Sequence, residues 1–300
     1  MTEPAAHTRP WVRQMSGRDP GEAHRASTPL ELLFDLTFVV AVARAMTTQL
    51  ENTVALVTGS SSGIGAATAR RLAAGGATVA LVARRRDRLD GLAAAIRADG
   101  GTALVIPADV TSEQQAADAI EQAVAALGRL DIVVNNAGIM LLGPALDATI
   151  DEWDQMVALN VRGMLYITHA ALPHLVRAAA GSPPRQVADL VTISSTGGRV
   201  ARPGSSVYNL TKFGAAAFSE ALRQELLSRR VRVSVVEPGT VDTELITHLR
   251  EDIRQAATSQ TASIGPLRPE DIADAVAYIV TRDRRVAVNE ILVRAAEQTW

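Results

Sequence analysis

The sequence predicts a doubly wound α/β domain, in which a seven-stranded parallel sheet is covered by helices on both faces. After residue 53, short apolar runs alternate with longer alanine- and leucine-rich stretches of helical periodicity. The apolar runs are continuous, as expected for strands that are buried on both faces. Strands that alternate with helices are joined by right-handed crossovers and run parallel, and ligands bind beyond their carboxyl ends.

The elements follow one another in a regular order. Strands are predicted at residues 54–57, 78–82, 103–106, 132–134, 188–193, 231–236 and 290–293. Helices are predicted at 64–75, 87–98, 112–127, 151–179, 207–229 and 269–280. The run Gly181-Ser182-Pro183-Pro184 predicts a surface loop before the fifth strand.

Length and composition narrow the class of protein. A chain of 300 residues accommodates one domain of about 250 residues and an appendage. The net charge of −2 shows no electrostatic signature of nucleic-acid or anionic-lipid binding. The absence of cysteine excludes disulfides, thiolate catalysis and cysteine-ligated metals, and it fits a cytoplasmic protein. The five histidines lack metal-ligand spacing, so no metal site is expected.

Residues 1–50 do not follow this pattern and are interpreted as an N-terminal extension of a catalytic domain at 51–300. Residues 1–28 are polar and predicted to be disordered, and a short apolar helix can begin at Thr28 and Pro29. The charge-free stretch 36–43 is shorter than the ~20 residues of a membrane-spanning helix. Two words, Pro29-Leu30-Glu31-Leu32 and Phe34-Asp35-Leu36-Thr37-Phe38-Val39, resemble the opening of low-temperature-requirement-A-type membrane proteins. The extension is therefore an accessory helix or leader, or alternatively a membrane tether through residues 29–46.

The first strand runs into a glycine-rich turn, Thr58-Gly59-Ser60-Ser61-Ser62-Gly63-Ile64-Gly65, and then into a helix. Glycines let the backbone approach a pyrophosphate, and the helix N-terminus offers free N–H groups and the positive end of its dipole. This TGxxxGxG turn after the first strand resembles that of the classical short-chain dehydrogenases/reductases, and the resemblance extends over about residues 52–295. It implies a Rossmann-like fold and cofactor contacts from Gly59, Ser61, Ser62, Gly63, Ile64 and Gly65.

The end of the second strand indicates which cofactor binds. An acidic residue there would bind the 2′-hydroxyl of NAD, but this chain has Ala83-Arg84-Arg85-Arg86. Arg84, with Arg85 beside it, is placed to pair with a 2′-phosphate through charge-assisted hydrogen bonds. Arg86 and Arg88 are interpreted as a solvated helix start. The predicted cofactor is NADP(H).

Further cofactor contacts are implied by the resemblance. Asp109 and Val110 would flank the adenine. In the word Asn135-Asn136-Ala137-Gly138, Asn135 would stabilise the sheet, while Asn136, Ala137 and Gly138 would lie against the cofactor. The word Pro238-Gly239-Thr240-Val241-Asp242-Thr243 matches the family's PGxVxT pattern, so Pro238, Gly239, Val241 and Thr243 would contact the nicotinamide and the pyrophosphate.

Tyr208 and Lys212 lie four residues apart on a predicted helix and therefore on the same face. A phenol has a pKa of about 10, which is too high for acid–base work near neutral pH. A nearby ammonium, together with an oxidised nicotinamide, favours the phenolate and lowers that pKa. Tyr208 is therefore predicted to be the general acid/base. Lys212 is the only lysine among the 30 basic residues.

The resemblance adds two catalytic residues. Ser195 would hydrogen-bond the substrate oxygen, whereas Ser194 would pack at the strand end. Asn160 would hold a water that connects Lys212 with bulk solvent. Met140, Leu141, Leu142, Val200 and Leu245 suggest a partly apolar substrate pocket under a lid at 244–266, and Arg202 is interpreted as a surface residue.

Together these features predict an NADP(H)-dependent oxidoreductase that acts on CH–OH groups and interconverts an alcohol with a ketone, aldehyde or 3-oxo acid. A homo-tetramer or homo-dimer packed through the helices of Asn160 and Tyr208 is implied by the resemblance. The C-terminus lacks the glycine pair of many 3-oxoacyl-carrier-protein reductases and looks closer to the 3-hydroxy acid, serine and clavaldehyde-type branch, so the substrate is open. Two alternatives are a non-catalytic nucleotide-binding regulatory protein and the same reductase tethered to a membrane.

Overall fold

The computed structural model describes residues 49–299 except 182–184, 252, 256–257 and 260–263. The predicted helix and membrane-protein resemblance of the N-terminal extension lie outside these residues, as does most of the predicted loop at 181–184. No helix in the described part of the chain has the length and hydropathy needed to cross a bilayer.

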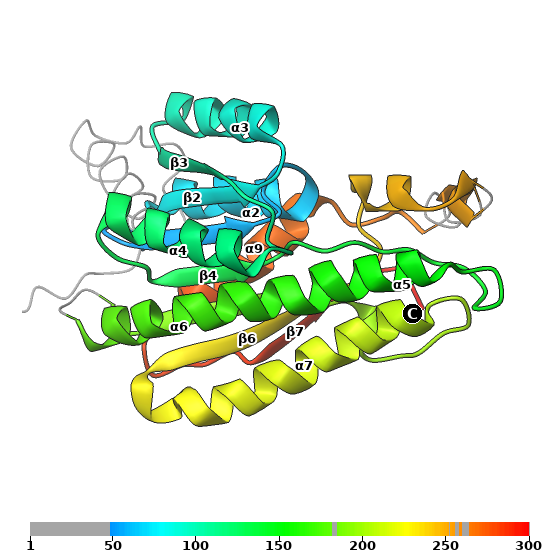
Figure 1. Ribbon diagram of the computed structural model, residues 1–300. Helices are drawn as coiled ribbons and strands as arrows, with labels where there is room; N and C mark the ends of the chain where they lie inside the picture. The colour runs from blue at the N-terminus through cyan, green and yellow to red at the C-terminus, as the bar shows by residue number, and fades with distance from the viewer. Residues whose placement is uncertain (1–48, 182–184, 252, 256–257, 260–263, 300) are drawn as a thin grey trace, which may run out of the picture. The chain divides into compact units, whose positions relative to one another are not determined.

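The predicted fold class is confirmed: seven parallel strands form one sheet in the order β3-β2-β1-β4-β5-β6-β7 (Figure 1). The strands are β1 (Val54–Thr58), β2 (Thr78–Ala83), β3 (Thr102–Pro107), β4 (Ile132–Asn135), β5 (Ala188–Ile193), β6 (Val231–Pro238) and β7 (Glu290–Val293). The chain moves outward from β1 to β3 and then returns to place β4 beside β1. The strand order therefore reverses between β1 and β4, which is where ligands bind in open α/β sheets.

Three long helices cover each face of the sheet (Figure 1). One face carries α2 (Gly63–Ala74), α3 (Arg86–Ala98) and α9 (Pro269–Val280), and the other carries α4 (Glu113–Leu127), α6 (Met164–Ala180) and α7 (Ser206–Leu226). Successive side chains of a strand enter opposite cores: Ala55 and Val57 face the first group, whereas Val54 and Leu56 face the second. Both faces of β1 are fully buried, which explains its continuous apolar run.

The predicted helix at 151–179 is three elements in the structure. A short α5 (Ile150–Met156) is followed by a π-helical segment, η1 (Val157–Gly163), and then by α6. Hydrophobic periodicity does not reveal a π-helix, because a single wide turn hardly changes the spacing of apolar residues. Such turns occur frequently at functional sites, and this one contains Asn160. Similarly, the predicted helix at 207–229 ends in the 3-10 turn η3 (Leu227–Arg229).

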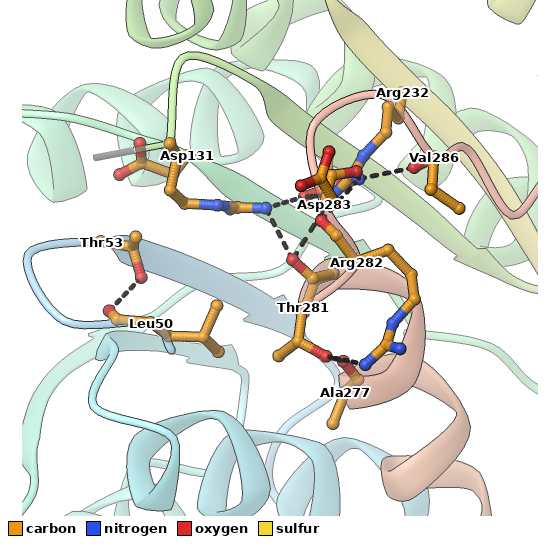
Figure 2. A network of polar contacts seen from close by, with 12 residues as sticks. Leu50, Thr53, Asp131, Arg232, Ala277, Thr281, Arg282, Asp283 and Val286 are labelled. Carbon is orange, nitrogen blue, oxygen red and sulfur yellow. Dashed lines mark hydrogen bonds and ion pairs between the residues drawn. The ribbon is translucent and has the colours of Figure 1, made fainter. Parts of the chain in front are cut away.

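Buried charges at the amino ends of the strands are closely paired (Figure 2). Arg232 of β6 donates to both carboxylate oxygens of Asp189 in β5, at 2.7 and 3.0 Å. Its Nη1 also donates to backbone carbonyls of the loop between α9 and β7, including that of Val286 at 2.8 Å, as Figure 2 shows. Asp131 pairs with Arg129 and accepts the N–H of Val54. Each of these carboxylates has both a counter-charge and hydrogen bonds, as buried ions require. They lie at the amino ends of the strands, away from the carboxyl ends where ligands bind in this fold class.

Candidate active site

A cavity of about 540 Å³ lies at the carboxyl ends of the strands. Its lining includes most of the residues predicted to bind the cofactor or act in catalysis: Gly59, Ser61, Ser62, Gly63, Ile64, Arg84, Arg85, Asp109, Val110, Asn136, Ala137, Gly138, Ser195, Tyr208, Lys212, Pro238, Gly239, Val241 and Thr243. Gly65 and Asn160 lie behind this lining. Segments far apart in the sequence thus meet at one edge of the sheet, as the fold class requires.

The glycine-rich turn after β1 is joined to the loop after β4. Thr58 Oγ1 accepts the N–H groups of Asn136 and Ala137, at 3.0 and 3.1 Å. Asn136 Nδ2 donates back to the carbonyls of Thr58 and Gly59, at 2.9 and 3.3 Å. The side chain of Asn136, which the resemblance placed against the cofactor, therefore also holds the turn together.

Glycine is required in this turn because the two segments approach so closely. Gly59 has a φ of +65°, and a Cβ there would lie 2.8 Å from the Cα of Ala137. A Cβ at Gly65 would lie 2.4 Å from both Asn136 Nδ2 and the Gly59 carbonyl oxygen. Both distances are far below van der Waals contact, so no side chain fits without moving the turn.

At the opposite end of the turn, Arg85 contacts the serines predicted to bind the cofactor. Its Nη2 donates to Ser61 Oγ at 3.0 Å and to Ser62 Oγ at 2.9 Å, and it pairs with Glu244 Oε2 at 2.9 Å. Arg84, the residue predicted to bind a 2′-phosphate, lines the same cavity and has no hydrogen-bond or ion-pair partner among the described residues. The contact of Glu244 with Arg85 was not predicted from the sequence, in which Glu244 is only an acidic residue directly after the PGxVxT motif.

Tyr208 and Lys212 lie on one face of α7 and are buried, with exposed fractions of 8% and 9%. The ammonium of Lys212 lies 5.8 Å from the centre of the Tyr208 ring and donates to the carbonyl of Ile193 at 2.9 Å. Ser195 lines the same cavity, and its Oγ accepts the N–H of Gly197 at 3.0 Å. Ser194 also lines the cavity, but its Oγ donates to the Lys212 carbonyl at 3.1 Å. The geometry thus brings together Tyr208, Lys212 and Ser195, and it leaves Ser194 to packing.

Burial shifts the pKa values of both Tyr208 and Lys212 in the protein without a cofactor. Burial raises the pKa of Tyr208, and the hydrogen bond with Ser195 opposes this only in part. Burial also lowers the pKa of Lys212 from 10.5 to about 8. Removal from water disfavours the charged form of both groups. The lowering of the Tyr208 pKa was predicted for Lys212 together with an oxidised nicotinamide, and it stays a prediction.

Asn160 connects the loop after β4 with the catalytic helix. Its Oδ1 accepts the N–H of Ile139 at 2.8 Å, and its Nδ2 donates to the Ile139 carbonyl at 2.9 Å and to Thr211 Oγ1 at 3.2 Å. A Cβ at Gly138 would lie 3.3 Å from Asn160 Oδ1 and 3.8 Å from Lys212 Nζ, which places all three close together. The side-chain amide of Asn160 is thus used to position backbone and helix, and the water it was expected to hold stays a prediction.

Two residues that hold loops of the site in place were not predicted from the sequence. Asn209 Nδ2 donates to the carbonyl of Gly197 at 2.6 Å, and its Oδ1 accepts the N–H of Arg202 at 3.1 Å, so it fixes the loop after Ser195 onto α7. Gln298 Oε1 accepts the N–H of Thr240 at 2.9 Å and thereby joins the C-terminal segment to the PGxVxT loop. Neither residue belongs to a motif, so sequence spacing provides no signal for them.

The remainder of the cavity lining contains both apolar and polar side chains. Met140, Leu142, Val200 and Leu245, four of the five residues predicted for the substrate pocket, line it, whereas Leu141 does not. The exposed Arg202 also borders the cavity, so it is more than a distant surface residue. Within the described ranges, no cluster of histidine, aspartate and glutamate could hold a metal ion.

Comparisons with known proteins agree with this arrangement. A family model described as short chain dehydrogenase matches residues 53–254. An uncharacterised oxidoreductase of Staphylococcus aureus (strain MRSA252) is 36% identical over 247 residues, which cover 82% of this chain and 99% of the relative.

Two solved structures are similar over the same region. A 3-ketoacyl-(acyl-carrier-protein) reductase from Brucella melitensis, complexed with NADH, has a TM-score of 0.73 at 31% identity and covers 83% of this chain and 99% of its own. A short chain dehydrogenase from Burkholderia cenocepacia, in complex with NADP, has a TM-score of 0.72 at 31% identity and covers 82% of this chain and 98% of its own.

The close approach at Gly65 predicts that Gly65→Ala lowers the free energy of unfolding by about 1–3 kcal/mol, because the added methyl group overpacks the turn. Gly91→Ala is the matched control: it lies within α3 with no atom within 4 Å of the added Cβ, and it should stabilise by about 0.5–1 kcal/mol. Urea unfolding followed by circular dichroism measures both. Equal effects of the two substitutions would contradict the proposed close approach.

The lowered pKa of Lys212 predicts a pH dependence of stability. Between pH 8 and 10 the folded protein loses the Lys212 proton while the unfolded chain, with a pKa near 10.5, keeps it. Because the unfolded state then binds more protons, stability rises with pH over this interval. Relative to Lys212→Met, the wild type should gain about 2 kcal/mol between pH 8 and 10. A constant difference between the two unfolding curves would show that Lys212 has an ordinary pKa.

Proposed function

The chain belongs to the short-chain dehydrogenase family, and on that premise we propose that it is an NADP(H)-dependent oxidoreductase that interconverts a carbonyl compound and an alcohol. The observation that carries the proposal is the buried Tyr208, which lies beside Lys212 and lines the same cavity as Ser195. A protein that only binds nucleotides has no need of this combination.

The residues of the cavity fit a nicotinamide dinucleotide. Gly59, Ser61, Ser62 and Gly63 of the glycine-rich turn line the cavity, and α2 begins within this turn. Arg84 and Arg85 provide positive charge at the end of β2. When bound, the nicotinamide supplies or accepts the hydride.

Tyr208 performs the proton chemistry in this proposal. In the direction of reduction its hydroxyl donates a proton to the carbonyl oxygen of the substrate, and in the reverse direction it removes the proton of the alcohol. Ser195 orients the hydroxyl of Tyr208 and offers a hydrogen bond to the same oxygen. Lys212, held by the carbonyl of Ile193, is the cation that stabilises the phenolate when Tyr208 has lost its proton.

The preference for NADP(H) is proposed on the charges of this chain, since the similar structures include one complex with NADH and one with NADP. No carboxylate occupies positions 83–86, where one would bind the 2′-hydroxyl of NAD and repel a 2′-phosphate. Arg84 and Arg85 lie at the cavity wall in its place.

The substrate class follows from the apolar part of the cavity. Met140, Leu142, Val200 and Leu245 favour a small, mostly apolar ketone, aldehyde or 3-oxo acid, with the exposed Arg202 at the border available to a carboxylate. A panel of such carbonyl compounds, followed by NADPH absorbance, would identify the substrate.

Assembly into a homo-tetramer or homo-dimer is part of the proposal. Leu210 and Phe213 of α7 are exposed apolar side chains, and an apolar groove runs along α4, α6 and α7. A cytoplasmic location is proposed from the cysteine-free sequence.

Tyr208→Phe should lower kcat/KM by about 10²–10⁴-fold, because it removes the hydroxyl that is proposed to transfer the proton. Binding of NADPH, measured by fluorescence titration, should change less than twofold. Tyr278→Phe, which removes the hydroxyl of an exposed tyrosine on α9, serves as the control and should keep wild-type activity. Substantial turnover by Tyr208→Phe would refute the mechanism.

Arg84→Asp should raise the KM for NADPH by at least about tenfold while changing that for NADH much less, because the new carboxylate repels the 2′-phosphate and can bind a 2′-hydroxyl. Arg86→Asp is the matched control, since Arg86 lies outside the cavity lining and pairs with Asp90 at 3.6 Å. If Arg84→Asp left the ratio of the two KM values unchanged, the assignment of Arg84 would be wrong.

A further inference from the structure

We propose that Glu244 is a built-in competitor of the cofactor's 2′-phosphate for Arg85, and that this carboxylate sets how strongly the enzyme prefers NADP(H) over NAD(H). The inference rests on the proposed function, because it assumes that a 2′-phosphate binds at the arginines that follow β2. It assigns a specificity-determining role to a residue of the segment after β6.

The first observation is the set of contacts made by Arg85. The guanidinium donates to Ser61 and Ser62 of the glycine-rich turn and pairs with Glu244 Oε2 at 2.9 Å. Glu244 Oε1 also lies 4.0 Å from Arg88 Nη2. The Nε and Nη2 groups of Arg85 are therefore directed at two hydroxyls and a carboxylate of the protein itself.

The second observation explains why Glu244 reaches this position. It is the first residue of the 3-10 helix η4 (Glu244–His248), whose N-cap Thr243 accepts the N–H of Leu245. The Thr243 methyl group lies 3.1 Å from where a Cβ of Gly63 would be, so the start of η4 is seated on the glycine-rich turn. The backbone thus brings Glu244 to Arg85 across the cavity, although 159 positions separate the two residues.

Glu244 is ionised at neutral pH. Hydrogen bonds from Arg85 above all, and also from Ser62, hold the pKa of its carboxyl below the ordinary value despite partial burial. It therefore presents a full negative charge to any anion that approaches Arg85.

Charge then separates the two cofactors. A 2′-phosphate is an anion that must either displace the carboxylate from Arg85 or lie beside it, and both lower its affinity. The 2′-hydroxyl of NAD(H) is neutral, so the carboxylate does not lower the affinity of NAD(H) in this way. The side chains of Arg85 and Glu244 are 44% and 41% exposed, so the ion pair is weak enough for a phosphate to displace. Glu244 thus reduces the preference for NADP(H) without abolishing it.

A different role for the same pair predicts a different result. If Arg85 and Glu244 formed a clasp over the bound dinucleotide, removal of the carboxylate charge would weaken NADP(H) and NAD(H) alike. If Glu244 is a competitor, removal of its charge should make NADP(H) bind more tightly and leave the binding of NAD(H) unchanged.

The test is Glu244→Gln in the full-length protein, with the affinities for NADP⁺ and NAD⁺ measured by isothermal titration calorimetry. The Kd for NADP⁺ should fall about fivefold or more, while the Kd for NAD⁺ changes less than twofold. Glu251→Gln is the matched control, because Glu251 is an exposed acid of the same segment that pairs with Arg254, and it should change neither Kd. In an Arg85→Ala background, Glu244→Gln should have no selective effect.

The outcomes separate the inference from the function on which it rests. If the wild type binds both cofactors equally and Arg85→Ala leaves NADP⁺ binding unchanged, the proposed NADP(H) preference fails, and the competitor fails with it. If that preference holds but Glu244→Gln leaves it unchanged, or weakens both cofactors alike, the inference alone is overturned. A selective gain that persists in Arg85→Ala would also overturn it, because Glu244 would then act without Arg85.

Discussion

The joint between the turn after β1 and the loop after β4 is the contact on which the remaining site geometry depends. Thr58 and Asn136 exchange hydrogen bonds there, and Gly65 has no room for a side chain. From the same loop, Ile139 is held by Asn160, which also bonds Thr211, and Thr211 Oγ1 donates to the Tyr208 carbonyl at 2.8 Å. Hydrogen bonds and the backbone between Asn136 and Ile139 therefore connect the glycine-rich turn with the helix that carries Tyr208.

Charged side chains have different surroundings at the amino ends and at the carboxyl ends of the strands. At the amino ends of the strands, Arg232 and Asp189 neutralise each other in the protein interior. At the carboxyl edge, Lys212 is buried with a backbone carbonyl as its hydrogen-bond acceptor, and Arg84 faces the cavity. Positive charge at that edge is thus available to stabilise anions that form or bind there: a phenolate at Tyr208 and the phosphates of a dinucleotide.

Two segments outside the sequence motifs, the start of η4 and the C-terminal residues, make contacts at the wall of the cavity. The start of η4 places Glu244 against the arginine of the opposite wall, and the C-terminal segment reaches Thr240 through Gln298. Both are attached to the same loop after β6, one at each side. Glu244 and Gln298 both line the cavity, so these two segments form part of its wall.

The sequence by itself determined the sheet, its helices, and the meeting of Tyr208, Lys212 and Ser195. Continuous apolar runs report burial on both faces, and a spacing of four on a helix makes two side chains neighbours. Only the tertiary structure decided that Asn160 lies in a π-helical turn, that Asn209 holds the loop after Ser195, that burial raises the pKa of Tyr208, and that Arg85 faces Glu244. The physical reason is that periodicity and spacing report only contacts between residues close in the sequence, within one turn of a helix or one strand. Desolvation and pairing between distant segments depend on how the elements pack against one another.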